Sequence, residues 1–111
     1  MTRYPWTETI AERTFEFHSA AGAVEPIQLT LGKPAMIPGA PDGDWYCPYR
    51  LASSGEVRES YAGGVDAVQA VLLALSKVWA ELRHFPKSGI VLWLEEPDLG
   101  LQTIAPQPPL E

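Results

Sequence analysis

Residues 64–83, GVDAVQAVLLALSKVWAELR, decide the fold because they combine a helix start with one long apolar face. At about 100° per residue, the larger apolar side chains fall within an arc of roughly 140°, which is typical of a helix that covers a sheet. This arc contains Val65, Val68, Val71, Leu72, Leu75, Val78, Trp79 and Leu82. Pro86 cannot continue a helix. We therefore predict one amphipathic helix of about 20 residues and about 30 Å.

Three residues are expected to build the start of this helix. Gly64, with Gly63, breaks the preceding strand, and Asp66 complements the helix dipole. Gln69 is expected to hydrogen-bond the neighbouring strand or loop. A phosphate site at this helix start is disfavoured, because Asp66 repels an anion and no glycine-rich phosphate motif is present. We interpret Gly64, Asp66 and Gln69 as structural residues.

Alternating apolar and polar residues on either side of the helix predict strands. They cover residues 11–18, 27–31, 45–52 and 56–61, and a short apolar run follows at 90–94. Residues 32–44 are rich in glycine and proline and predict a long surface loop. The expected class is α+β. We predict a mostly antiparallel sheet of about five strands, in the order β-β-β-β-α-β, with the helix packed on one face.

The 111 residues are enough for one domain, and 46% hydrophobic with 20% charged residues is a globular composition. We expect a single α+β domain over residues 10–96. Residues 1–9 are interpreted as an N-terminal extension and residues 97–109 as a proline-rich tail. Residues 110–111 are hypothesised to be the remnant of an affinity tag.

Charge and composition narrow the classes of function. A net charge of −6 with eight scattered basic residues argues against a binder of nucleic acid or of anionic membranes. Neither a membrane span nor a signal peptide is expected, and the single cysteine favours a cytoplasmic location. The sequence lacks an EF-hand loop, His-x-x-x-His and Cys-x-x-Cys, so neither a metal nor a cofactor is predicted.

Trp45, Cys47 and Tyr49 share one face of a predicted strand and are the candidate ligand-binding residues. In this hypothesis, residues 32–44 form a lid over a small ligand or a substrate. Cys47 is the only thiol nucleophile, and catalysis would require one of the two histidines as its base. The favoured interpretation of Cys47 is a small buried hydrophobic residue.

Ala70 and Leu73 are the candidate partner contacts. Leu73 is an apolar residue on the polar side of the predicted helix, and Ala70 lies on the same side. Together they could contact a partner helix or a second copy of the chain. The favoured function is therefore a non-catalytic protein-interaction module that binds a protein partner or forms a homodimer. A small-ligand-binding protein or enzyme is the alternative.

Two segments resemble a family of short uncharacterised bacterial proteins. Residues 44–50, DWYCPYR, match its tryptophan-x-cysteine-proline-tyrosine strand, and residues 64–71, GVDAVQAV, match its helix start. Residues 10–13, IAER, are also similar, so the resemblance spans roughly residues 10–95. It implies a bacterial, cytoplasmic, stand-alone domain. Because the family has no assigned activity, the resemblance implies no catalytic or binding residue.

Overall fold

A computed structural model describes residues 4–40, 42–83 and 89–101, and all structural statements below concern these residues. The elements are β1 (Thr9–Ser19), β2 (Val24–Gly32), β3 (Ala35–Met36), β4 (Trp45–Ser53), β5 (Glu56–Gly64), α1 (Ala67–Arg83) and β6 (Gly89–Leu92). Every strand pairing is antiparallel. The predicted α+β class is confirmed, and the order gains one strand to become β-β-β-β-β-α-β.

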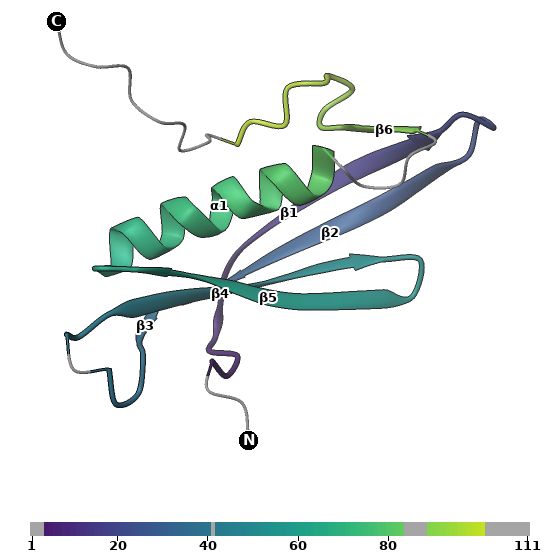
Figure 1. Cartoon of the computed structure of the whole chain (residues 1–111). Helices are drawn as coiled ribbons and strands as arrows, with labels where there is room; N and C mark the ends of the chain where they lie inside the picture. The colour runs from purple at the N-terminus through teal and green to yellow at the C-terminus, as the bar shows by residue number, and fades with distance from the viewer. Residues whose placement is uncertain (1–3, 41, 84–88, 102–111) are drawn as a thin grey trace, which may run out of the picture.

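In the sheet, β4 pairs with three other strands. β5 pairs with the whole length of β4, so β2 and the short β3 share the other edge of β4. Beyond β2 the order continues through β1 to β6. α1 leaves the β5 edge, crosses one face of the curled sheet and returns the chain to the β6 edge (Figure 1). The helix therefore connects the two edges of the sheet.

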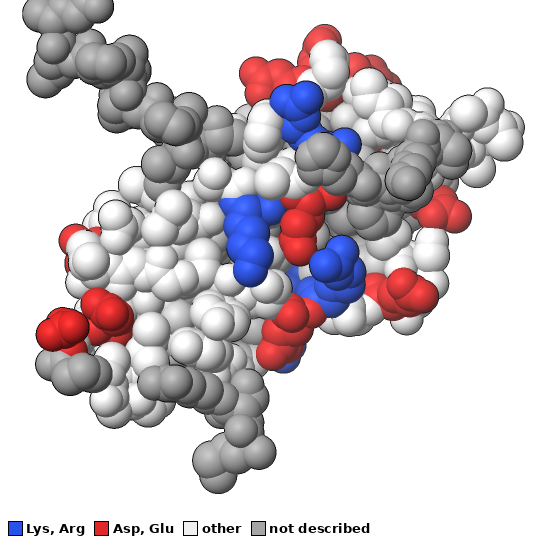
Figure 2. Space-filling view, viewed as in Figure 1, with Lys and Arg blue, Asp and Glu red and all other residues white. Residues whose placement is uncertain are grey.

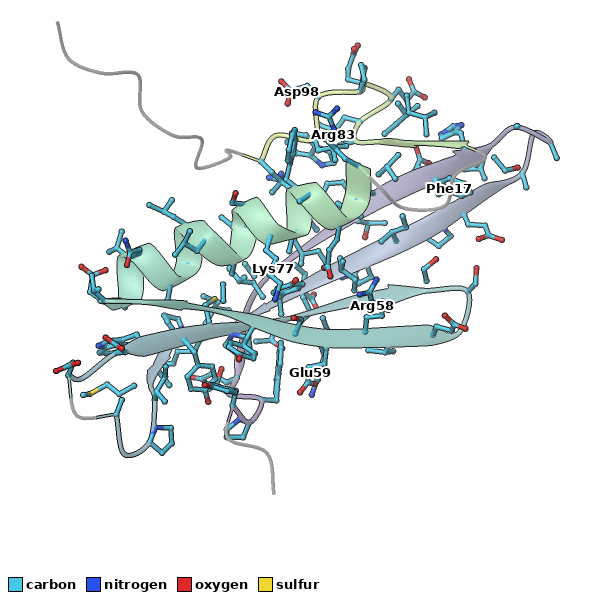
Figure 3. The ribbon with its side chains drawn as sticks, in the orientation of Figure 1. Phe17, Arg58, Glu59, Lys77, Arg83 and Asp98 are labelled. Atoms are coloured by element: carbon cyan, nitrogen blue, oxygen red, sulfur yellow. The ribbon has the colours of Figure 1, made fainter. Side chains whose placement is uncertain are left out.

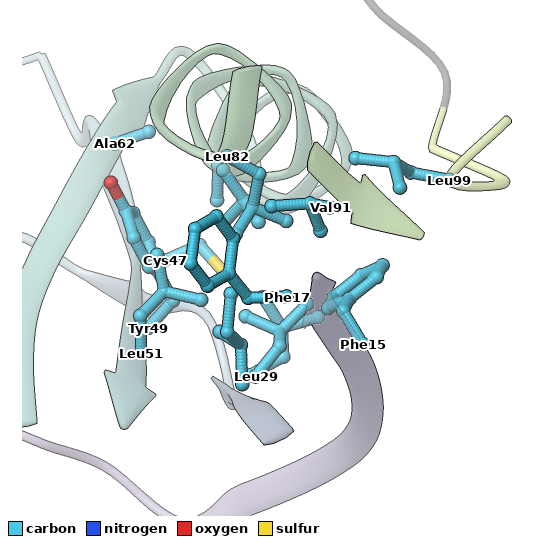
Figure 4. Close-up of a cluster of buried hydrophobic side chains, with 14 of the residues drawn as sticks. Phe15, Phe17, Leu29, Cys47, Tyr49, Leu51, Ala62, Leu82, Val91 and Leu99 are labelled. Carbon is cyan, nitrogen blue, oxygen red and sulfur yellow. The ribbon is translucent and has the colours of Figure 1, made fainter. Parts of the chain in front are cut away.

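The core lies between α1 and the inner face of the sheet. Alternate residues of neighbouring strands meet there, as in the pairs Phe15 with Ile27 and Leu29 with Leu51. Figure 4 shows Phe17, Leu82 and Val91 meeting in this cluster. Alternation on β1 and β2 explains why one face is apolar, because successive side chains of a strand point to opposite faces. On β4 both faces are buried, since Tyr46 and Pro48 are buried as well as Cys47 and Tyr49.

The face that α1 buries differs from the predicted arc. Its buried residues are Ala70, Ala74, Val78 and Leu82, spaced four residues apart. Small residues in the first half of the helix allow its backbone to lie close to the sheet. As a result, Val65 and Val68 are 70% and 68% exposed, and their predicted place in the core is wrong.

The predicted exposure of Ala70 and Leu73 is also wrong. Ala70 is completely buried, and Leu73 is partly buried against the core. The physical reason is the same rotation of the helix, which turns the alanine stripe toward the sheet. Ala70 is therefore unavailable to a partner in this structure, whereas Leu73 keeps part of its side chain at the surface.

Three predicted boundaries also change. Gly63 and Gly64 do not break the strand as expected, because both belong to β5 and pair with Tyr46 and Trp45. Residues 32–44 contain β3, which pairs with Trp45 and Tyr46, so this segment is not one uninterrupted loop. α1 begins at Ala67, two residues after the predicted start. The predicted end of the helix near Pro86 lies outside the described residues.

The chain segments on both sides of the predicted domain contact it. Before β1, the Tyr46 hydroxyl donates a hydrogen bond to the Pro5 carbonyl at 2.8 Å, and Tyr4 stacks on Tyr61 with ring centroids 3.9 Å apart. After β6, Leu99 is only 5% exposed. Among the described residues, contacts with the domain therefore extend from Tyr4 on one side to Leu99 on the other. The rest of the predicted tail, including residues 110–111, lies outside the described residues.

Candidate functional site

Cys47 is fully buried in the core beneath α1. Its thiol lies 3.4 Å from the Gly32 carbonyl oxygen, and burial raises the pKa of the thiol to about 11. The thiol is therefore protonated at neutral pH, whereas a cysteine nucleophile acts as the thiolate. Trp45 is half-buried and Tyr49 is buried, and the five main hollows on the described part of the chain have linings without these three residues. The geometry gives no support to a ligand site under residues 32–44.

Tyr49 instead belongs to a polar network that joins β4, β5 and α1. Its hydroxyl donates a hydrogen bond to Glu81 Oε2 at 2.8 Å, and Arg58 donates to Glu81 Oε1 at 3.3 Å. Burial raises the pKa of Tyr49, and the hydrogen bond to Glu81 raises it further. One turn earlier, Lys77 donates to the Ser60 hydroxyl at 2.9 Å (Figure 3). This network holds the second half of the helix over the sheet.

The start of α1 is held by two side-chain hydrogen bonds. Asp66 Oδ1 accepts from the Gln69 backbone N–H at 2.8 Å, and Gln69 Oε1 accepts from the Val65 N–H at 2.8 Å. This reciprocal arrangement resembles a capping box, in which side chains satisfy the unpaired donors of the first turn. Asp66 and Gln69 therefore fix the direction of the helix, and with it the outward position of Val65.

The exposed side of this helix start carries the best candidate for a binding surface. We name it the helix patch and define it by Ile10, Val65, Val68 and Leu72, which are 50%, 70%, 68% and 40% exposed. A shallow groove of about 350 Å³ runs through it. The groove is lined by Ile10, Pro34, Ala67, Val68, Val71 and Leu72, without any charged residue.

A β-bulge contributes Ile10 to the helix patch. The pairing of β1 with β2 shifts between Thr9 and Ala11, so Ile10 is the extra residue opposite Gly32 and Leu31. A bulge changes the direction of a side chain and is frequent next to functional sites. Here the bulged residue, Ile10, lines the groove together with Val68 and Leu72.

An acidic residue adjoins the helix patch, because Asp66 directly follows Val65. In Figure 2, the surface over the first half of α1 is mostly uncharged, and the red atoms on this side lie at its margin. The surface therefore combines an apolar centre with the carboxylate of Asp66 next to it in the chain.

Three residues of the helix patch belong to the apolar arc that the sequence predicts, but the prediction placed them in the core. Val65, Val68 and Leu72 belong to the wide apolar arc, and the sheet covers only part of that arc. The alanine stripe at Ala70 and Ala74, following Gly64, was the signal for the true contact face, because small residues mark a close approach.

Two properties of the described residues concern metal sites and membrane spans. Within the described ranges, no group of three or more His, Cys, Asp or Glu side chains could hold a metal ion. Over the same residues, α1 is the only helix, and it is neither long nor apolar enough to cross a membrane.

Together, the fold and the helix patch define a small α+β domain with an antiparallel curled sheet, one covering helix and an exposed apolar surface. The chain belongs to the family described as a domain of unknown function (DUF6968), whose model matches residues 11–103. Comparison with curated proteins and with solved structures yields no match. The family match therefore supplies no activity.

Proposed function

We propose that the chain is a non-catalytic protein-interaction module that binds a partner protein through the helix patch. The observation that supports this function is the exposure of Val65 and Val68 at 70% and 68%, beside Leu72 and Ile10. Apolar residues gathered in a patch, with a polar border, mark protein-interaction surfaces. Exposing them has a cost in solubility that a binding role explains.

The groove suits a protein better than a small molecule. A small-molecule site has a concave apolar wall with a few polar groups that fix the orientation of the ligand. The groove beside Val68 is shallow, and its lining contains neither a charged nor a hydroxyl side chain. An aliphatic side chain on a protein surface requires only apolar contact, so it fits this lining.

The border of the helix patch defines the chemistry of the partner. The net charge of −6, with Asp66 directly after Val65, favours a partner whose apolar contact is surrounded by lysine or arginine. We include a bacterial cytoplasmic setting in the proposal. Its support is the resemblance of residues 44–50 and the lone, buried Cys47.

Val68→Glu tests this function against a matched control, Val57→Glu. Val57 is 63% exposed on β5 and is not part of the helix patch, so both variants place the same charge on a similarly exposed valine. Quantitative affinity purification from lysate, using each purified variant as bait, identifies proteins retained by the wild type. Purified candidates are then titrated by calorimetry.

A partner whose affinity falls at least roughly tenfold in Val68→Glu but stays unchanged in Val57→Glu would support the helix patch. Light scattering of the chain alone, over a range of concentrations, tests whether the partner is a second copy. Equal behaviour of the two variants, or the absence of both a partner and self-association, would contradict the proposed function.

A further inference from the structure

A tight turn follows β6 and has unusual residues at its centre. Trp93 and Glu96 exchange both backbone hydrogen bonds, at 2.9 and 3.0 Å, and Leu94 and Glu95 connect them. Leu94 and Glu95 have φ angles of 52° and 66°. These angles define a two-residue hairpin turn in which both central residues are left-handed, a geometry dominated by glycine, asparagine and aspartate.

The same chain builds another such turn with ordinary residues. Ser54 and Gly55 connect β4 to β5 with φ angles of 50° and 80°. Glycine adopts the left-handed conformation without a steric penalty, whereas a leucine side chain crowds its own backbone there. The position of Leu94 is therefore unfavourable for folding. The contrast between the two turns identifies two unusual residues, Leu94 in place of a serine and Glu95 in place of a glycine.

The turn is held in place by packing against its base. The Arg13 guanidinium lies 3.8 Å from the centroid of the Trp93 ring and donates hydrogen bonds to the Leu99 and Gly100 carbonyls at 3.0 and 3.2 Å. Gly100 lies against the six-membered ring of Trp93. A Cβ atom added to Gly100 would overlap that ring, so a larger residue would not fit. Strained conformations persist where the surrounding structure determines them, and they gather at functional sites.

Leu94 projects from this rigid base into solvent. It is 75% exposed, the highest value among the large hydrophobic residues described. Its immediate neighbours in sequence are acidic, since Glu95 and Glu96 follow it, and Asp98 is close behind. Figure 2 shows a group of acidic atoms at the top of this view, and Figure 3 labels Asp98 in that region.

Leu94 is therefore unfavourable for both conformation and solubility. From this combination, we infer that the turn is a second protein-binding element, with Leu94 as an apolar anchor. The partner surface that fits it has an apolar pocket bordered by lysine or arginine, because Glu95, Glu96 and Asp98 follow the anchor within four residues and Glu16 lines the same hollow as Leu94 and Glu95. The rigid turn lowers the entropy cost of binding, since the anchor is already in position. The inference rests on the proposed class of function but not on the helix patch.

Selection of a random peptide library on the immobilised full-length chain provides the probe. The peptides recovered are labelled, and their binding to the wild type and to variants is measured by fluorescence anisotropy. We expect peptides that combine apolar residues with lysine or arginine. Their affinity should fall at least roughly tenfold in Leu94→Asn. It should also fall when salt is raised from about 50 mM to about 500 mM, which screens the carboxylates.

Two control variants separate this inference from the helix patch. Ser54→Asn changes the equivalent position of the other turn and should leave peptide binding unchanged. Loss of binding in Leu94→Asn with retention in Val68→Glu supports the turn as an independent element. Loss in Val68→Glu with retention in Leu94→Asn supports the helix patch alone and overturns the inference. Recovery of no peptide that distinguishes Leu94→Asn from the wild type also overturns it.

Thermal unfolding of Leu94→Asn supplies a second criterion. Asparagine tolerates the left-handed conformation better than leucine, so the melting temperature should stay constant or rise by roughly 2–4 °C. Loss of binding then cannot result from unfolding. A fall of several degrees would show that Leu94 stabilises the fold, and this result would overturn its assignment as a binding anchor.

Discussion

Gly64 at the end of β5 lies directly against the backbone of Ala70 in the first half of α1. A Cβ atom built on Gly64 would be 2.5 Å from the Ala70 nitrogen and 3.0 Å from its Cα. Gly64 does not have a left-handed φ angle, so the requirement for glycine at this position is one of space. This contact gives the Gly-Val-Asp-Ala-x-Gln-Ala segment a physical meaning, because its first and last residues are the two that touch.

Gly64→Ala should therefore destabilise the fold. Inserting a methyl group against backbone atoms forces the helix to move and costs about 1–3 kcal/mol. Gly63→Ala is the matched control, because the nearest atom to its added Cβ is the Trp45 carbonyl oxygen at 3.7 Å. Urea unfolding followed by circular dichroism measures both. Equal stabilities of the two variants would show that the helix is not held at this close distance.

The fold class was predictable because the strands alternate and the helix carries an apolar arc. Residues 11–18 and 27–31 fall within β1 and β2, and residues 45–52 fall within β4. The rotation of α1 was not predictable from hydrophobicity, which ranks Val65 and Val68 above Ala70. The decisive factor is the approach distance set by Gly64, and a pattern of hydrophobicity contains no distances.

Asp66→Ala should remove the cap of α1. Asp66 Oδ1 accepts the Gln69 N–H at 2.8 Å, and loss of such a cap costs about 1 kcal/mol. Asp66→Asn keeps an acceptor oxygen at the same place, so it should retain most of the stability. Thermal unfolding of the three proteins provides the measurement. If Asp66→Ala has the same melting temperature as the wild type, the hydrogen bond contributes nothing to stability.

Cys47 should make the fold less stable at alkaline pH. Burial raises its pKa from 9.0 to about 11, so the native state favours the neutral thiol. This stabilisation is complete below about pH 9 and is lost as the pH rises through about 11, because the unfolded chain releases the proton first. Urea unfolding at about pH 8 and about pH 10.5 should show a larger loss for the wild type than for Cys47→Ala.

A thiol reagent gives an independent check on Cys47. In native protein near pH 8, the buried thiol should react slowly with Ellman's reagent, and denaturant should make the reaction fast, because thiolate and access are both required. Rapid reaction of the native protein would contradict the burial of Cys47. It would also restore the hypothesis of a reactive cysteine beside Trp45 and Tyr49.

The candidate sites were harder to predict than the fold. Trp45, Cys47 and Tyr49 alternate on one strand face, but this pattern is shared by core residues, and the core contains both Cys47 and Tyr49. The strain at Leu94 had no signal in composition, since it arises from a φ angle that only the completed turn defines. The position of Ile10 depends on a bulge, which one sequence does not reveal.

Removal of residues 1–6 should destabilise the chain, because the segment before β1 covers the outer face of the sheet. Tyr46 is 2% exposed there, and its hydroxyl donates to the Pro5 carbonyl at 2.8 Å. The Trp6 ring lies 3.9 Å from the Arg50 guanidinium carbon, and Tyr4 stacks on Tyr61. An aromatic pair and a hydrogen bond together amount to roughly 2 kcal/mol.

Urea unfolding by circular dichroism measures this effect without depending on Trp6. Pro5→Ala is the control, because it retains the carbonyl that accepts the Tyr46 hydroxyl and should change the stability little. Tyr46→Phe removes only the donor and should cost about 1 kcal/mol. If the shortened chain unfolds at the same urea concentration as the wild type, residues 4–6 lie on the sheet without stabilising it. The folded unit then begins at β1.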